Sequence, residues 1–346
     1  MTGENDIIFE KRGAAGLVTL NRPQALNALT HAMVVAMKTQ LDAWAADPEV
    51  ACVVVVGAGE RAFCAGGDIR ALAQSGRTGT SYALDFWRDE YILNAAIKHY
   101  PKPYVALISG FAMGGGLGIS VHGTYRVADE TTQVAMPETG IGFFPDVGSS
   151  YFMPRCPGEI GMYLALTGAR LKAADALYAG IATHLVRAET RQMLLDALVQ
   201  GENPAEFLSE FEVRPLPEAP LAEQRVTIDN IFCLASVEEI LERLDEKGDA
   251  WTAATAATIR TKSPTSLKIT FRELREGKTL SLDDCLRMEF RISSRILAGY
   301  NFIEGVRVLL VEKGAAAKWR PASLGEVRDD VVDSYFALLG ERELPL

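Results

Sequence analysis

Apolar residues in the first part of the chain come in short runs, separated by longer stretches with a helical spacing. Residues 6–12 and 15–20 carry clustered apolar side chains around the sequence GAAG, so we expect two strands joined by a turn. Residues 51–56, ACVVVV, are mostly β-branched. Such a run is typical of a strand that is buried on both faces.

Two longer stretches have the spacing of amphipathic helices. Within residues 27–46, Leu29, Met33 and Met37 recur every four positions and predict one apolar face, and residues 81–99 also have a helical spacing. KPYVALISG predicts another buried strand, the glycine run in FAMGGGLGISVHG opens another helix, and YRVADE and TTQVAMPE are short strand candidates. This repeated order of strand, turn and helix predicts an α/β fold.

The pattern changes near the sequence ENPAEFLSEFEVRPLPEAPLAEQ, which is rich in Pro and Glu. Almost every segment beyond it has a helical spacing. We therefore predict an α/β core over residues 1–205, a connector over residues 206–221, and a helical C-terminal region over residues 222–346.

Composition narrows the class of protein. The chain of 346 residues has a formal net charge of −10, which argues against nucleic acid as a partner, whereas a polyanionic small ligand needs only a local positive cluster. Apolar runs are far shorter than a bilayer span, so we expect no membrane partner. The cysteines include no CxxC pair and the histidines no HExxH, so we expect no metal and no disulfide framework. A reducing cytoplasm is the simplest location.

Two glycine-rich loops follow predicted strands and precede predicted helices. They are GAGERAFCAGGD and the triple glycine Gly114–Gly116. Neither fits the dinucleotide fingerprint well, because FCAGGD interrupts the first loop and Ile119 departs from it in the second. Each loop alone is equally consistent with tight packing. Together, two such loops can supply one N–H group each to an oxyanion that develops during a reaction.

The stretch PETGIGFFPDVGSS contains two acids, Glu138 and Asp146, in apolar surroundings that are rich in turns. A solvated loop would contain more Ser, Asn and Lys, and an amphipathic helix would not tolerate this much Pro and Gly. Acids that cap helices are the ordinary explanation. The alternative is a pair of catalytic carboxyl groups, with Phe143 and Phe144 excluding water.

Four segments together resemble the enoyl-CoA hydratase/isomerase, or crotonase, superfamily. These are NRPQALNAL (21–29), RAFCAGGDIRAL (61–72), ALISGFAMGGGLGIS (106–120) and MPETGIGFFPDVGSSYFMPR (136–155). Within the superfamily, the chain is most similar to the branch that hydrolyses short hydroxyacyl-CoA thioesters. That closer resemblance also uses KPYVAL, SVHG, SPTSLKIT, CLRMEFR and FIEGVRVLLVEK, and therefore covers nearly the whole chain.

The resemblance implies a crotonase-like spiral of strand–strand–helix repeats with a helical C-terminal region. The implied reaction is hydrolysis of a short branched hydroxyacyl-CoA such as 3-hydroxyisobutyryl-CoA, an intermediate of valine degradation. It implies oxyanion N–H groups at Gly67 and Gly115, and Glu138 and Asp146 as catalytic acids. The CoA is part of the substrate, and no separate cofactor is implied.

The resemblance also implies substrate contacts. CoA is expected against the main chain around Ala65, Asp68 and Ile69. Glu90, in RDEYILN, matches a substrate-contacting glutamate, although a solvated helix face is an equally good explanation for it. The family also includes trimers and pairs of trimers, so a homo-oligomer is possible, but the C-terminal helices could cover that surface instead.

One position departs from the hydratase pattern. A hydratase has a catalytic glutamate two residues after the triple glycine, where this chain has Gly118. Hydration needs two acids at one double bond, so the usual pair is broken. Two alternatives stay open: a hydratase or isomerase that uses Asp146 instead, and an acyl-CoA-binding protein without catalysis.

Overall fold

The structure is a computed structural model that describes residues 6–312 and 314–346, so the first five residues of the predicted core lie outside it. The chain forms two compact units that do not follow chain order. Of the described residues, the first unit contains 6–67, 92–135 and 170–223, and the second unit contains 68–91, 136–169, 224–312 and 314–346. The predicted domain boundaries at residues 205 and 221 stay a prediction.

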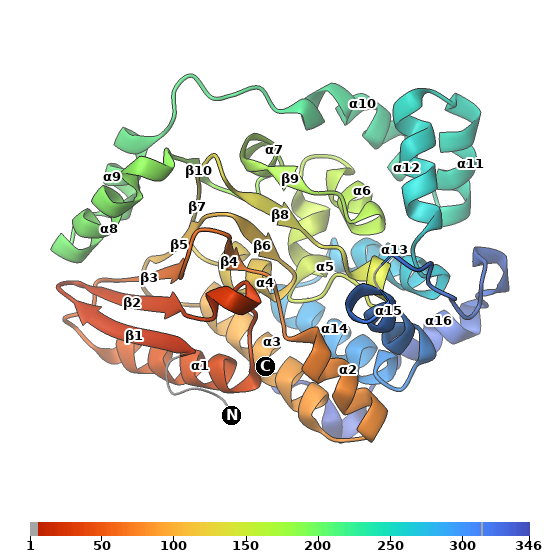
Figure 1. Ribbon diagram of the computed structural model, residues 1–346, viewed down its shortest axis with the longest axis horizontal. Helices are drawn as coiled ribbons and strands as arrows, with labels where there is room; N and C mark the ends of the chain where they lie inside the picture. The colour runs from red at the N-terminus through yellow and green to blue at the C-terminus, as the bar shows by residue number, and fades with distance from the viewer. Residues whose placement is uncertain (1–5, 313) are drawn as a thin grey trace. The chain divides into compact units, whose positions relative to one another are not determined.

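The main sheet of the first unit has the strand order β1-β2-β3-β5-β7-β10 (Figure 1). Its strands are β1 (Ile7–Arg12), β2 (Ala15–Leu20), β3 (Cys52–Gly57), β5 (Tyr104–Ile108), β7 (Tyr125–Ala128) and β10 (His184–Leu185). β1 and β2 form an antiparallel hairpin, and the other neighbours are parallel. The strands predicted at residues 6–12, 15–20 and 51–56 are confirmed to within one residue.

Both faces of the inner strands β2, β3 and β5 are largely buried, whereas β1 at the edge is half-buried or exposed. Leu17, Val54 and Val105 belong to an apolar cluster on one face, together with Leu194 and Leu198 of the helix α8 (Arg191–Gln200). Their neighbours in the strands, such as Val53 and Val55, are also buried. The nearly continuous apolar runs are therefore needed, because a parallel sheet covered on both sides has no solvated face.

Helix α1 (His31–Ala46) begins later than the stretch of residues 27–46 that we predicted as helical. Thr30 caps the helix by accepting a hydrogen bond from Met33 N. Asn27 lies before this cap in a left-handed conformation, with φ of 56°. Its side-chain amide donates to the carbonyl oxygens of Ala58 and Ala62, which fixes the chain outside the helix.

A second sheet of the first unit has the order β4-β6-β8-β9. Its strands are β4 (Ala62–Cys64), β6 (Phe111–Met113), β8 (Gln133–Ala135) and β9 (Leu171–Lys172). Strand pairs β3–β4, β5–β6 and β7–β8 each place one strand in the main sheet and the next in this sheet. The short helices α4 (Gly115–Val121) and α7 (Ala173–Tyr178) follow strands of this sheet. This repeat confirms the predicted α/β spiral of strand–strand–helix turns.

Two helices connect the units along the chain, α3 (Tyr82–Lys98) and α10 (Pro220–Phe232). In the first unit, α9 (Pro204–Phe211) occupies the start of the predicted connector. Asn203 caps it and Pro204 stands at its first position, which suits proline because no N–H is needed there. Pro204, one of the prolines of the stretch rich in Pro and Glu, therefore begins a helix.

The second unit is helical. Its elements are α2 (Ile69–Thr78), part of α3, η2 (Glu138–Ile141), α5 (Ser149–Phe152), α6 (Ile160–Thr167), α11 (Val237–Lys247), α12 (Ala250–Arg260), α13 (Pro264–Gly277), α14 (Leu282–Ile296), α15 (Tyr300–Leu310) and α16 (Asp329–Phe336). Figure 1 shows α11 and α12 packed as a pair. Ser236, Asp249, Ser263 and Ser281 each cap the helix that follows, so the helical reading of this region is confirmed. No helix of the described residues is both long and apolar enough to cross a membrane.

Candidate active site

The acids that the sequence singled out lie in the second unit and are buried. Glu90 is on α3, Glu138 begins η2, and Asp146 lies in the segment before α5. Their exposed fractions are 2%, 8% and 5%. The structure therefore excludes a solvated helix face for Glu90.

No lysine, arginine or histidine of the described residues forms an ion pair with these three carboxyl groups, and one oxygen each of Glu90 and Glu138 has no hydrogen-bond partner there. Burial is the largest cause that raises their pKa values, since it disfavours the charged form. Nearby acids raise the pKa values of Glu90 and Glu138 further. The three acids therefore keep protons at a pH where exposed acids are ionised.

Asp146 is held by a tyrosine. The hydroxyl of Tyr91 donates a hydrogen bond of 2.8 Å to Oδ2 of Asp146. Burial raises the pKa of Asp146 to about 7, although this hydrogen bond opposes the rise. Burial and the charge of Asp146 raise the pKa of Tyr91 well above its usual value, so the phenol stays a donor. Sequence reasoning missed Tyr91, because its position one residue after Glu90 gives no sign that it is buried.

Aromatic side chains surround the segment that carries these acids. Phe143 and Phe144 are both buried, and their ring centroids are 4.7 Å apart. Trp87 stacks on Phe143 with ring centroids 5.1 Å apart, and Phe302 packs against Phe143 with ring centroids 5.4 Å apart. These buried rings give the acids apolar surroundings, which is the reason for the raised pKa values.

Two further acids of the second unit are fully buried, Glu273 on α13 and Glu289 on α14. Both oxygens of Glu273 lack a partner among the described residues, and burial raises its pKa well above the usual value. Burial raises the pKa of Glu289 to about 8. Sequence reasoning missed both acids. A signal for their burial was present in the sequence, because an acid in the apolar stripe of a helix faces the core. Glu289, for example, lies four residues after Cys285 and seven before Ile296, which are both buried.

The glycine loops belong to the first unit, and their main-chain directions can be followed from hydrogen bonds. Leu29 N donates to the carbonyl oxygen of Gly66 at 2.8 Å. In a trans peptide the N–H points opposite to the C=O, so the N–H of Gly67 points away from Leu29. The carbonyl oxygen of Gly114 likewise accepts hydrogen bonds from Leu117 N and Gly118 N in α4. The N–H of Gly115, in the same peptide group as that carbonyl, therefore points out from the start of the helix.

These two loops pack closely against each other at Gly66 and Gly116. A Cβ on Gly66 would lie 3.3 Å from Gly115 N, and one on Gly116 would lie 2.2 Å from the carbonyl oxygen of Cys64. Gly66 also has a φ of 97°, which favours glycine. The glycines are therefore required where one main chain approaches another, and Gly67 and Gly115 lie on these two loops.

The three residues around which we expect CoA, Ala65, Asp68 and Ile69, have local structural roles in this structure. Ala65 N donates to Leu26 O at 3.0 Å in the first unit. In the second unit, Asp68 caps α2 by accepting from Ala71 N, and Ile69 is the first residue of that helix. No group of three or more His, Cys, Asp or Glu side chains in residues 6–312 and 314–346 is arranged to hold a metal ion.

Comparison with known proteins gives consistent results. A family model described as enoyl-CoA hydratase/isomerase matches residues 15–336. The mitochondrial 3-hydroxyisobutyryl-CoA hydrolase of Xenopus tropicalis is 50% identical, over 99% of this chain and 91% of the relative. The human protein of the same name is 43% identical, over 98% of this chain and 90% of the relative.

These relatives correct one expectation. They are named mitochondrial proteins, so the cytoplasmic location that we expected is wrong. Unpaired cysteines and the lack of long apolar runs are compatible with several compartments, which is why composition could not distinguish them.

Solved structures extend the likeness to the fold. A carnitinyl-CoA dehydratase from Mycobacterium thermoresistibile matches with a TM-score of 0.94 and 42% identity, over 99% of both chains. An enoyl-CoA hydratase from Rhodobacter sphaeroides matches with a TM-score of 0.92 and 38% identity, over 99% of this chain and 100% of that chain. The glycine loops, the buried acids and these similarities agree, and the chain belongs to the enoyl-CoA hydratase/isomerase family.

Proposed function

We propose that the protein hydrolyses 3-hydroxyisobutyryl-CoA to 3-hydroxyisobutyrate and free CoA. The observation that carries this proposal is the set of acids. Gly118 stands where a hydratase has its first glutamate, whereas Asp146 is buried and paired with Tyr91. The names and identities of the curated relatives support the same substrate.

Glu138 is the proposed catalytic carboxylate. It either attacks the thioester carbon, forming an anhydride that water then hydrolyses, or removes a proton from the attacking water. In both routes water supplies the OH of the new acid, the C–S bond breaks, and the CoA thiolate takes up a proton. A buried carboxylate with a raised pKa is poorly solvated and correspondingly basic, which suits this role.

The N–H groups of Gly67 and Gly115 are the proposed donors to the thioester oxygen. The carbonyl oxygen becomes negatively charged when its carbon is attacked, and such donors stabilise that charge. We assign CoA contacts to Ala65, Asp68 and Ile69 on the family resemblance. Glu90 is assigned a substrate contact on the same basis, and its burial with an unpartnered oxygen supports that role.

Asp146 is the proposed acceptor for the 3-hydroxyl group of the substrate. A buried acid that binds the hydroxyl group of the substrate discriminates against esters without this group, because its own polar atoms are then left unpaired. We also assign it a part in proton handling, because its charge raises the pKa of Glu138.

A second candidate is reversible hydration of an enoyl-CoA, with Asp146 replacing the missing glutamate. The observation in its favour is the carnitinyl-CoA dehydratase, whose structure matches over 99% of both chains. Like the hydrolase, such an enzyme would act on a 3-hydroxyacyl-CoA.

One experiment separates these functions. The purified protein is given 3-hydroxyisobutyryl-CoA, and thiol release is measured beside hydration of crotonyl-CoA. We expect thiol release, little hydration, and loss of nearly all turnover in Glu138→Gln with substrate binding retained, because the amide keeps the shape but not the basicity. Rapid hydration without thiol release would support the second candidate, and binding without turnover of either ester would indicate a non-catalytic protein.

A further inference from the structure

Glu289 is fully buried on α14 and is bound to the segment that follows Asp146. Its Oε2 accepts a hydrogen bond of 2.7 Å from Gly148 N. Its Oε1 accepts bonds of 3.0 Å from Ser150 N and 2.5 Å from the hydroxyl of Ser150. One side chain thus satisfies two main-chain donors directly after the proposed substrate-binding acid.

The segment that Glu289 binds has an unfavourable backbone. Val147 has a φ of 55° and Gly148 a φ of 84°, so two successive residues are left-handed. For a β-branched residue this conformation costs roughly 1–2 kcal/mol. Such a turn persists only when its surroundings fix it. The bonds from Glu289 fix the main chain on one side of Asp146, while Tyr91 binds its carboxyl group.

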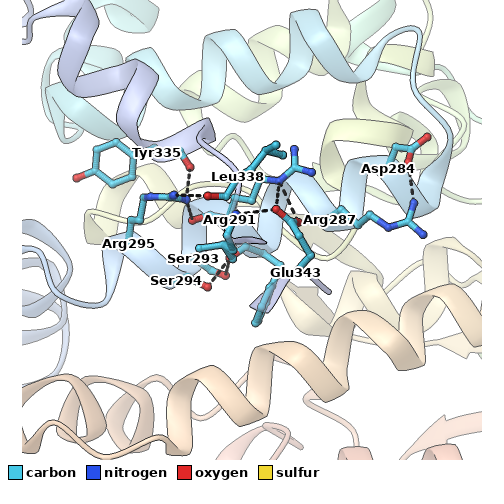
Figure 2. A network of polar contacts seen from close by, with 11 residues as sticks. Asp284, Arg287, Arg291, Ser293, Ser294, Arg295, Tyr335, Leu338 and Glu343 are labelled. Carbon is cyan, nitrogen blue, oxygen red and sulfur yellow. Dashed lines mark hydrogen bonds and ion pairs between the residues drawn. The ribbon is translucent and has the colours of Figure 1, made fainter. Parts of the chain in front are cut away.

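Helix α14 is itself anchored on its opposite face. Arg287, Arg291 and Arg295 recur every four residues. Arg287 and Arg291 each lie about 160° around the helix from Glu289, and Arg295 lies about 120° from it. Figure 2 shows Arg291 bound to both oxygens of Glu343, and Arg295 bound to the carbonyl oxygens of Tyr335 and Leu338.

The same helix also supports Tyr91. The ring of Phe290, the residue after Glu289, packs edge-on against the ring of Tyr91 with centroids 6.4 Å apart. Adjacent residues of α14 therefore contact both elements that hold Asp146: the turn at residues 147–150 and the tyrosine that donates to its carboxyl group.

We propose that Glu289 is a positioning residue that sets the orientation of Asp146, and thereby the selectivity for the 3-hydroxyl group of the substrate. The inference rests on the proposed role of Asp146. Glu289 lies in the helical C-terminal region, so this region takes part in selectivity through the turn at residues 147–150.

The variant that tests this is Glu289→Gln. A carboxyl group, ionised or protonated, can accept from both N–H groups and still bond the hydroxyl of Ser150. An amide of the same shape has one accepting oxygen, so its NH₂ must face either Gly148 N or Ser150 N, donor against donor. The turn then moves without the loss of any packed volume.

The experiment uses the full-length protein and two esters, 3-hydroxyisobutyryl-CoA and isobutyryl-CoA, which differ in the hydroxyl group. For Glu289→Gln we expect kcat/KM to fall at least about tenfold for the hydroxylated ester and by less than about threefold for the other. The matched control is Glu273→Gln, which replaces an equally buried glutamate without hydrogen-bond partners among the described residues. Its selectivity between the two esters stays within about twofold of the wild type.

Ser150→Ala is a milder second variant, for the case that Glu289→Gln does not fold. It removes the hydroxyl bond to Glu289 and keeps the bonds from Gly148 N and Ser150 N. We expect a smaller loss of selectivity in the same direction. A folded Glu289→Gln with wild-type selectivity would overturn the inference, as would an equal loss for both esters. If Glu289→Gln does not fold, unchanged selectivity in Ser150→Ala has the same meaning.

Asp146→Asn distinguishes the inference from the proposed function beneath it. If this variant keeps wild-type selectivity, the role of Asp146 fails and the inference fails with it. If it loses selectivity while a folded Glu289→Gln keeps it, only the inference fails.

Discussion

Gly116 shows how little space the glycine loops leave for a side chain. An added Cβ would lie 2.2 Å from the carbonyl oxygen of Cys64, which is main chain and cannot rotate away. In Gly116→Ala we therefore expect the start of α4 to shift, together with the N–H of Gly115. Loss of one oxyanion donor typically costs about 10²–10³ in rate, so we expect a loss of roughly that size in kcat.

The measurement is thiol release from 3-hydroxyisobutyryl-CoA together with a melting curve. Gly325→Ala is the control, because a Cβ at Gly325 meets nothing within 4 Å. A folded Gly116→Ala with the wild-type rate would mean that the N–H of Gly115 is not part of the reaction.

At the scale of elements, the outer face of α14 carries a testable part of the stability. Arg291 is bound to both oxygens of Glu343 at 3.0 and 3.1 Å, and both side chains are about three-quarters buried. The Nε–H of Arg291 is shared between the two carboxylate oxygens. In Arg291→Met we expect the free energy of unfolding to fall by roughly 1 kcal/mol, since a partly buried ion pair is screened less by water than an exposed one.

Denaturant unfolding measures this change. The control is Arg328→Met, which breaks an ion pair with Asp330 in which both side chains are largely exposed. We expect that change to stay within about 0.5 kcal/mol. Equal effects of the two substitutions would show that the contact with Glu343 gives α14 no special support.

At the scale of the whole molecule, the buried acids predict an unusual dependence of stability on pH. Burial raises the pKa of Asp146 to about 7 and that of Glu289 to about 8, whereas both titrate near pH 4 in the unfolded chain. Between these values the folded protein binds more protons than the unfolded chain. Stability is therefore greatest at the acidic end of this window and falls as pH rises through 7 to 8.

We expect the free energy of unfolding to be lower at pH 8.5 than at pH 5.5 by at least ~2 kcal/mol. Surface acids such as Asp245, whose pKa is lowered by Arg260, act only at more acidic pH. His184 opposes the trend near pH 6, since burial lowers its pKa, but it is a single group. Denaturant unfolding between pH 5.5 and 8.5 measures how the free energy of unfolding changes with pH. We expect a smaller change in Asp146→Asn, because the amide does not titrate. A stability that rises toward pH 8.5 would contradict the assignment of raised pKa values.

Much of the fold could be predicted because local patterns carry it. The β-branched run at residues 51–56 and the four-residue spacing of residues 27–46 report burial directly, whatever the rest of the chain does. The start of α1 at His31 could not be predicted from the local pattern. Thr30 caps α1 only because Asn27 is bound to the carbonyl oxygens of Ala58 and Ala62, more than 30 residues away.

The sequence by itself determined the family, the α/β class and the candidate residues Glu138, Asp146, Gly67 and Gly115, because these lie in short motifs that survive without coordinates. Tertiary structure decided the environment of the acids. Tyr91 and Glu289 lie 55 and 143 positions from Asp146, and no local pattern links them to it. The burial of Tyr91, Asp146 and Glu289 depends on helices that meet only when the chain folds. The raised pKa values of these three groups follow from that burial.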